Sequence, residues 1–135
     1  MKKTVLELGS NEAYVVLDDA DLETAISACT QGRLINNGQT CVSAKRFVVV
    51  DALYSDFKAM IKKQFENTKM GDPNEKDSDL GPMAREDLRD KLHQQVKESI
   101  EAGAEAVVGG EIPERQGFYY PATLLENIKP GMPAY

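Results

Sequence analysis

Two side chains of this 135-residue chain are suited to covalent chemistry, and the first is a cysteine. Cys41 lies in the polar stretch NNGQTCVSAKR, residues 36–46, where a turn is expected instead of a core segment. A thiol on such a loop is accessible, and backbone N–H groups together with Lys45 and Arg46 could favour its nucleophilic thiolate form. A loop cysteine with no chemical role is equally compatible with these residues.

Glu7 is the candidate partner that a nucleophilic thiol needs to move protons. It stands between Leu6 and Leu8 and interrupts an apolar run. It could face outward from a half-buried strand, or it could be a general base near an apolar pocket, with a pKa raised by desolvation. The single histidine, His93, falls off the apolar stripe of its predicted helix, so we expect it at the surface. The sequence therefore disfavours a Cys–His hydrolase.

Apolar, β-branched runs alternate with helical patterns along the chain, which predicts an α/β layer architecture. We expect extended segments at residues 4–8, 13–17, 46–51, 104–110 and 117–128. We expect one helix that begins among Asp18, Asp19 and Asp21 and ends near 36–38, and further helices at 54–67 and 84–102. Residues 70–83, rich in Asp, Gly and Pro, predict a long surface loop.

Helical spacing predicts which face of each helix is buried. Cys29 shares the apolar face of the first helix with Leu22, Ala25 and Ile26, so we expect it to be a core thiol. In the last helix, 84–102, the predicted apolar stripe consists of Leu88, Leu92, Val96 and Ile100.

Composition limits the class of protein. With 41% hydrophobic residues, a chain of this length can bury one modest core. The formal charge of −6 disfavours nucleic-acid binding, which needs a basic face. No apolar run reaches the length of a membrane span, so we expect a cytoplasmic protein without a membrane partner. Two cysteines are too few for a disulfide framework or a metal cluster, so we expect reduced thiols and no metal site.

Five stretches follow one another along the chain: LELGSN, VVLDDADLETAI, NNGQTCVSAKRFVV, GDPNEKDSDLGPM and YYPATLLENIKPGMPAY. In this order and spacing they resemble the aldehyde dehydrogenase superfamily, and LGPMAREDLRDKLHQQV is most similar to bacterial succinate-semialdehyde dehydrogenases. The resemblance covers essentially the whole chain. It implies part of the catalytic domain of such an enzyme, an α/β structure with a mostly parallel sheet flanked by helices.

The resemblance also implies roles for residues. Cys41 matches the thiolate that attacks the aldehyde, and Glu7 matches the carboxylate that activates water to release the acid. The backbone N–H of Cys41 would donate to the developing oxyanion. Leu8 and Gly9 match positions that approach the nicotinamide of NAD or NADP. Ser10 stands where the family commonly has a second glycine, which should perturb that turn modestly.

The parts of the family that the chain lacks lead us to expect a catalytic-domain fragment, residues 1–135, without the cofactor-binding domain and the C-terminal part. We expect the chain alone to be inactive, to bind NAD or NADP only weakly and to form a homo-oligomer. A carboxylate-bearing aldehyde needs a cationic anchor, and Arg33, Lys45 and Arg46 are near the thiol in sequence, although charged residues there are more often surface or ion-pairing groups. Two alternatives remain open at this point: a stand-alone thiol redox protein or hydrolase, and a non-catalytic, self-assembling domain.

Overall fold

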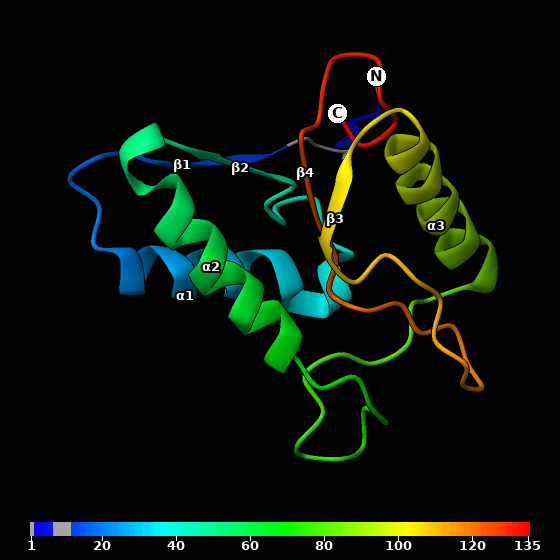
Figure 1. Ribbon diagram of the computed structural model, residues 1–135. Coiled ribbons are helices and arrows are strands. Elements are labelled where there is room, and N and C mark those ends of the chain that lie inside the picture. The colour runs from blue at the N-terminus through cyan, green and yellow to red at the C-terminus, as the bar shows by residue number, and fades with distance from the viewer. Residues whose placement is uncertain (1, 7–11) are drawn as a thin grey trace. The chain divides into compact units, whose positions relative to one another are not determined.

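The structure is a computed structural model that describes residues 2–6 and 12–135, shown in Figure 1. The chain forms two compact units, Met1–Phe57 and Lys58–Tyr135, each with buried residues of its own. Composition favoured a single core, whereas the structure has two units. The boundary between them falls within helix α2 (Asp51–Asn67): its first residues belong to the first unit and the remaining residues to the second.

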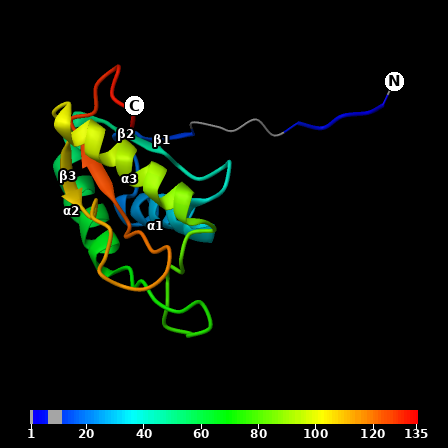
Figure 2. The same cartoon turned by 90° about the vertical axis from the view of Figure 1, so that its right-hand side faces the viewer.

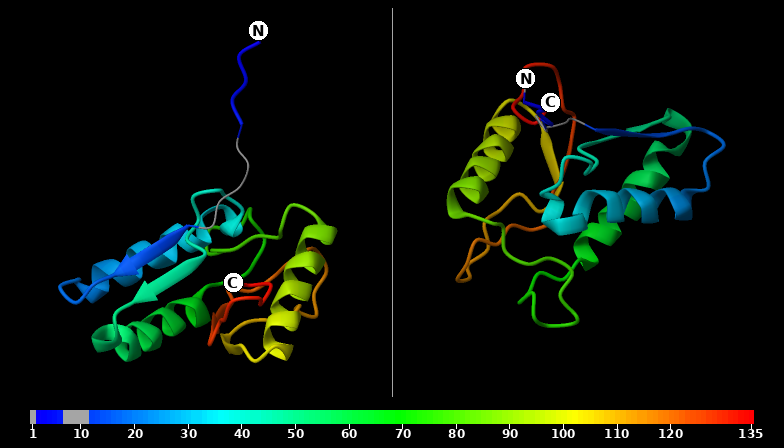
Figure 3. Two further views of the ribbon diagram at one scale, coloured as in Figure 1. Left: turned by 90° about the horizontal axis from the view of Figure 1, so that it is seen from above. Right: turned by 180° about the vertical axis from the view of Figure 1, so that it is seen from behind.

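The first unit is built on two parallel strands, β1 (Ala13–Val16) and β2 (Arg46–Val49), which lie side by side in Figure 3. Alternate residues of the strands face opposite sides. On one side the rings of Tyr14 and Phe47 pack edge to face, and Phe47 packs in the same way on the buried ring of Phe57. On the other side the paired residues Val15 and Val48 are 62% and 52% exposed.

Helix α1 (Leu22–Leu34) follows β1, as the sequence predicted. The side chain of Asp21 accepts a hydrogen bond of 2.8 Å from the backbone N–H of Thr24, which caps the first turn. Ile26 and Cys29 are buried, and Cys29 is only 2% exposed. The prediction that Cys29 is a core thiol is confirmed.

The predicted first strand, residues 4–8, is wrong over the part that the structure describes. Residues Thr4, Val5 and Leu6 form no strand, and Val5 is 90% exposed. An apolar run becomes a strand only where a neighbouring strand pairs with it, and neither described strand of this unit does so. Residues 7 and 8 of the same prediction lie outside the described residues.

The second unit contains the rest of α2, helix α3 (Glu86–Glu101) and an antiparallel pair of strands, β3 (Glu105–Val108) and β4 (Leu124–Glu126) (Figure 2). The Lys58 ammonium of α2 lies 2.6 Å from the Glu126 carboxylate of β4 and connects helix and strand. Residues 70–83 form the predicted surface loop, and a parallel bridge between Met70 and the buried Leu80 closes it.

Helix α3 buries only part of the predicted apolar stripe. Val96 of the stripe is buried, together with Ser99, whereas Leu88, Leu92 and Ile100 of the stripe are exposed. The hydroxyl of Ser99 donates to the carbonyl of Gln95 and accepts from the N–H of Ala134. A small hydroxyl that is fully hydrogen-bonded can be buried where a leucine side chain would need more room.

His93 is the clearest correction on this helix. It is half-buried instead of solvated, and its Nδ1 lies 3.1 Å from the hydroxyl of Tyr120. The Tyr120 hydroxyl donates its only hydrogen to the carbonyl of Gly110, at 3.2 Å, so Nδ1 of His93 is the donor in the other contact. The prediction of a surface histidine fails because a partner 27 positions away in sequence covers the ring.

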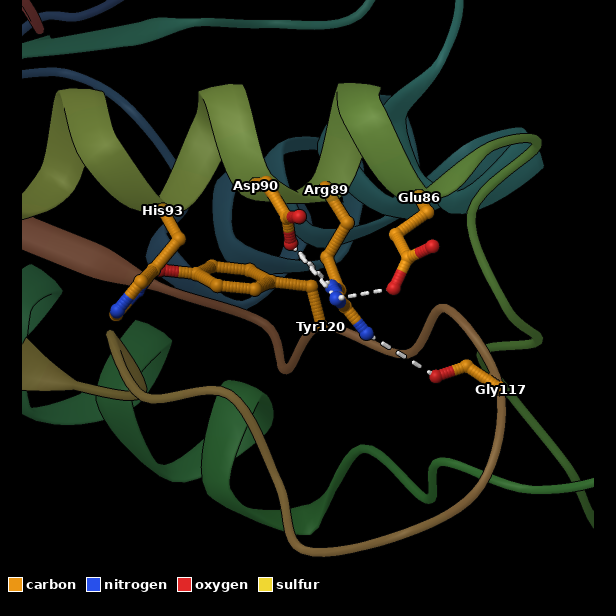
Figure 4. A network of polar contacts seen from close by, with 6 residues as sticks. All are labelled: Glu86, Arg89, Asp90, His93, Gly117 and Tyr120. Carbon is orange, nitrogen blue, oxygen red and sulfur yellow. Dashed lines mark hydrogen bonds and ion pairs between the residues drawn. The ribbon is translucent and has the colours of Figure 1, made fainter.

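Arg89, one turn before His93, fastens the same stretch of chain to α3 (Figure 4). Its guanidinium donates to the carboxylates of Asp90 and Glu86 and to the carbonyl of Gly117, and it lies 6.0 Å from the centre of the Phe118 ring. Residues 117–120 are thus held on α3 through polar contacts, which hydrophobic periodicity does not reveal.

The burial of Tyr120 predicts a pH-dependent stability. Burial, with a smaller contribution from Glu111, raises the pKa of Tyr120 to about 12, against about 10 in an unfolded chain. The fold thus favours the neutral phenol, and this contribution is complete below pH of about 10 and is lost as pH rises to about 12. We expect Tyr120→Phe to remove part of the fall in the free energy of unfolding between these pH values.

Urea denaturation across that pH range checks this expectation. The matched control is Tyr135→Phe, at an exposed tyrosine. Its free energy of unfolding should fall across this pH range as much as that of the unmodified chain. Equal slopes for the Tyr120→Phe variant and the unmodified chain would contradict the assignment.

Candidate active site

Cys41 lies on the loop between α1 and β2, and the path of the loop begins with three left-handed residues. The short turn η1 (Ile35–Gly38) follows α1, and Asn36, Asn37 and Gly38 have φ of 50°, 55° and 71°. Asparagine and glycine are the residues that adopt this conformation most readily. Three such residues in succession stop the helix and direct the chain into the loop, as the sequence predicted.

A tight turn then presents the cysteine. The N–H of Ser43 donates to the carbonyl of Thr40 at 3.3 Å, and the hydroxyls of the same two residues lie 2.8 Å apart. Cys41 and Val42 occupy the two central positions and are exposed, whereas Ser43 is fully buried. The turn is therefore anchored at its base and carries the thiol at its tip.

Two cations bind the carbonyls of this loop. Arg33, from the last turn of α1, donates to the carbonyls of Gly38 at 2.8 Å and Ala44 at 3.1 Å. Lys45 donates to the carbonyls of Cys41 and Ser43, each at 3.1 Å. Burial lowers the pKa of the Arg33 guanidinium, although an arginine remains charged at neutral pH. The positive charges of Arg33 and Lys45 thus face the backbone of the loop.

The bonded carbonyls also orient the N–H of Cys41. In a trans peptide the C=O and the following N–H point in opposite directions. The carbonyl of Thr40 accepts from Ser43 across the turn, so the N–H of Cys41 points away from the turn. This is the orientation that a donor to an external oxyanion needs.

Of the predicted site residues, the structure describes Cys41 but not the other three. Cys41 is on an exposed loop, as predicted. Glu7, Leu8 and Gly9 lie outside the described residues, so their roles stay predictions. Cys29 is buried, and burial raises the pKa of its thiol, so it is unsuited to nucleophilic chemistry.

From the sequence, Arg33 was interpreted as one of three possible anchors for a substrate carboxylate, with a surface or ion-pairing role as the alternative. Its hydrogen bonds to two carbonyls of the Cys41 loop were not predicted, and the spacing of Arg33 from the loop carries no signal that would reveal them.

The strand-to-helix turns of the first unit do not fit the nucleotide part of NAD or NADP. A pyrophosphate is held where a strand meets a helix, by glycines and by free N–H groups of the first helical turn. In the first unit, Asp21 caps α1 and Asp51 opens α2. These carboxylates would repel a pyrophosphate, and that of Asp21 already accepts an N–H of the first turn. Over residues 2–6 and 12–135, no three His, Cys, Asp or Glu side chains are grouped to hold a metal ion.

Comparison with known proteins identifies the family. The whole chain, residues 1–135, matches the Aldehyde dehydrogenase family. The chain belongs to this family, and with it the α/β fold class predicted from the sequence is confirmed. In the part of the chain that the structure describes, no helix has the length and apolar character needed to cross a membrane.

Individual relatives share the whole length of the chain. It is 46% identical to the succinate semialdehyde dehydrogenase [NAD(P)+] Sad of Escherichia coli and 42% identical to a probable succinate-semialdehyde dehydrogenase [NADP(+)] of Synechocystis, in each case over 100% of this chain. It spans 29% and 30% of the length of those two proteins.

Solved structures of aldehyde dehydrogenases are also similar to the chain. The succinic semialdehyde dehydrogenase of Streptococcus pyogenes, in complex with NADP+, is 36% identical and matches with a TM-score of 0.93 over 98% of this chain and 29% of its own. The lactaldehyde dehydrogenase of Escherichia coli is 34% identical and matches with a TM-score of 0.90 over 95% of this chain and 27% of its own.

Proposed function

We propose that the chain is the thiol-bearing part of the catalytic domain of an NAD- or NADP-dependent aldehyde dehydrogenase, and that Cys41 is its nucleophile. The observation that carries this proposal is the position of Cys41: an exposed thiol at the tip of a turn whose base is hydrogen-bonded and includes the fully buried Ser43, in a chain that matches the family throughout.

In the proposed reaction the Cys41 thiolate adds to the aldehyde carbonyl and forms a thiohemiacetal. The N–H of Cys41 donates to the oxygen, which carries the developing negative charge. A nicotinamide cofactor bound beside Leu8 and Gly9 would supply the acceptor for the hydride that the thiohemiacetal carbon loses as the thioester on Cys41 forms. Glu7 takes a proton from water, the hydroxide adds to the thioester, and the carboxylic acid leaves while the Cys41 thiolate is restored.

Succinate semialdehyde is the substrate we propose, because relatives at 46% and 42% identity carry that activity in their names. Those names specify NAD(P)+ for one and NADP+ for the other, so either nicotinamide cofactor fits the proposal. The described cations near the thiol do not single out a carboxylate anchor, because Arg33 and Lys45 bind backbone carbonyls.

We also propose that the enzyme is a cytoplasmic homo-oligomer, with the exposed Val15 and Val48 buried in the full assembly. A redox protein that pairs its two cysteines is disfavoured, because Cys29 is buried and a resolving thiol must be accessible. A hydrolase that uses His93 is disfavoured as well, because the imidazole is half-buried and hydrogen-bonded to Tyr120.

The 135-residue chain by itself should fold and yet show no dehydrogenase turnover. Hydride transfer requires a nicotinamide held close to the thiohemiacetal carbon, and the described strand-to-helix turns repel its pyrophosphate. Calorimetry with NAD and NADP, and absorbance of reduced cofactor with succinate semialdehyde, measure the two properties. Circular dichroism is the control for folding. Tight cofactor binding or sustained turnover by the folded chain would contradict the proposal that this chain is only part of the catalytic unit.

A further inference from the structure

A single guanidinium holds the two ends of the loop that carries Cys41. Arg33 Nη2 donates to the carbonyl of Gly38, three residues before the thiol, and Nη1 donates to the carbonyl of Ala44, three residues after it. The two carbonyls accept from different nitrogens of one rigid, planar group. The loop between them therefore cannot open without breaking at least one of these hydrogen bonds.

The loop is shaped around this guanidinium. A Cβ built on Gly38 would collide with Arg33 Nη2 and would stand 2.9 Å from Cζ, and Gly38 has a φ of +71°. Glycine at this position therefore gives the guanidinium room and permits the left-handed backbone. At the other end, Ala44 is fully buried and its N–H donates to the carbonyl of Gly32.

Arginine is suited to this task in a way that lysine is not. Lys45 binds the Cys41 and Ser43 carbonyls from the exposed side of the loop, with an ammonium that can rotate. The part-buried guanidinium of Arg33 holds its donors at a fixed separation and direction. It also replaces hydration that these part-buried carbonyls have lost, and a carbonyl left without a partner there would be costly.

We propose that Arg33 is the positioning residue of the nucleophile: it fixes the loop so that the Cys41 thiol and N–H are held in the geometry for attack. This rests on the proposed function of Cys41. Small displacements of a nucleophile are enough to slow a reaction by about 10²-fold. The competing role, an anchor for the substrate carboxylate, would leave the loop unaffected and would act on substrate binding alone.

Hydrogen exchange of the 135-residue chain tests the loop without any activity. Arg33→Lys keeps the positive charge and loses the two fixed N–H donors of the guanidinium. Gly38→Ala places a methyl group against the guanidinium. We expect the amides of Ser43 and Ala44, both hydrogen-bonded, to exchange about 10-fold faster or more in each variant. The amides of α1 and β2 should keep their rates.

Two control variants separate the loss of the Arg33 hydrogen bonds from general effects of substitution on the fold. Gly103→Ala adds a methyl group at a φ of +105°, where nothing lies within 4 Å, and therefore reports backbone strain alone. Arg85→Lys changes an exposed arginine. Both should leave the loop amides unchanged. Unchanged exchange at Ser43 and Ala44 in Arg33→Lys would overturn the proposal, and so would faster exchange throughout α1 and β2 in both loop variants.

Steady-state kinetics of the full-length enzyme complete the test. Arg33→Lys should lower kcat about 10- to 100-fold with succinate semialdehyde and with an uncharged aldehyde such as butanal, with little change in KM. A raised KM confined to succinate semialdehyde would overturn the positioning role and would make Arg33 the carboxylate anchor. Turnover by a Cys41→Ala enzyme would refute the proposed function, whereas the exchange result on the loop would still stand.

Discussion

Replacing Cys41 by alanine in the full-length enzyme is expected to abolish aldehyde oxidation. In the proposed mechanism the thiolate forms the bond that converts the aldehyde into a hydride donor, and no other described thiol can replace it, because Cys29 is buried. Loss of a nucleophile commonly lowers turnover by on the order of 10⁴-fold or more. Alanine fits the exposed tip of the turn, so the loop hydrogen bonds of Arg33 should be kept.

The matched control for this prediction is Cys29→Ala, which removes the same sulfur atom from the core. It should retain most of the activity and should react with iodoacetamide at a single thiol, Cys41. Steady-state rates of reduced-cofactor formation with succinate semialdehyde decide between the two cysteines. Normal turnover by the Cys41→Ala enzyme would refute the mechanism.

Local sequence patterns predicted the elements that carry Cys41. The Asn36-Asn37-Gly38 cluster placed the thiol on a loop, because these residue types adopt left-handed backbone at little cost, and the structure shows all three doing so. The spacing of Ile26 and Cys29 predicted their burial, since both lie on one face of a helix. Such inferences depend on residues that are close in sequence.

Contacts between distant residues were beyond these patterns. His93 was expected at the surface because it lies off the leucine stripe, yet Tyr120 covers it. Ser99 is buried because Ala134 supplies an N–H to its hydroxyl, and an apolar periodicity cannot indicate that. The carbonyls that Arg33 binds come together only once the loop has folded. Polar side chains with satisfied hydrogen bonds are the residues that hydrophobic spacing misassigns.

The strand pairing shows the same limit. Alternation of strands and helices predicted the α/β class, and β1 and β2 are parallel as such alternation favours. The pair β3 and β4 is antiparallel, although 15 residues separate Val108 from Leu124. That connection contains no helix, and its Tyr119 and Tyr120 are buried instead. Composition of the strands alone did not distinguish these two arrangements.

Replacing Glu7 by glutamine should separate the two halves of the proposed reaction. Glutamine is close in size to glutamate but cannot take a proton from water, so the thioester on Cys41 should form and then persist. A single turnover should give a burst of reduced cofactor of about one equivalent per active site, as expected when acylation outpaces the later step. The steady-state rate should then fall by roughly 10²–10⁴-fold, the range typical of a lost general base.

Rapid-mixing absorbance of the full-length enzyme resolves the burst, and mass spectrometry of the quenched protein locates the acyl group on Cys41. The control is Glu12→Gln, which makes the same change at an exposed glutamate just before β1. It should show neither the burst nor the loss of rate. An unchanged steady-state rate in Glu7→Gln would assign Glu7 to the outer face of its segment, because a carboxylate that activates the deacylating water cannot lose its charge without slowing release of the acid.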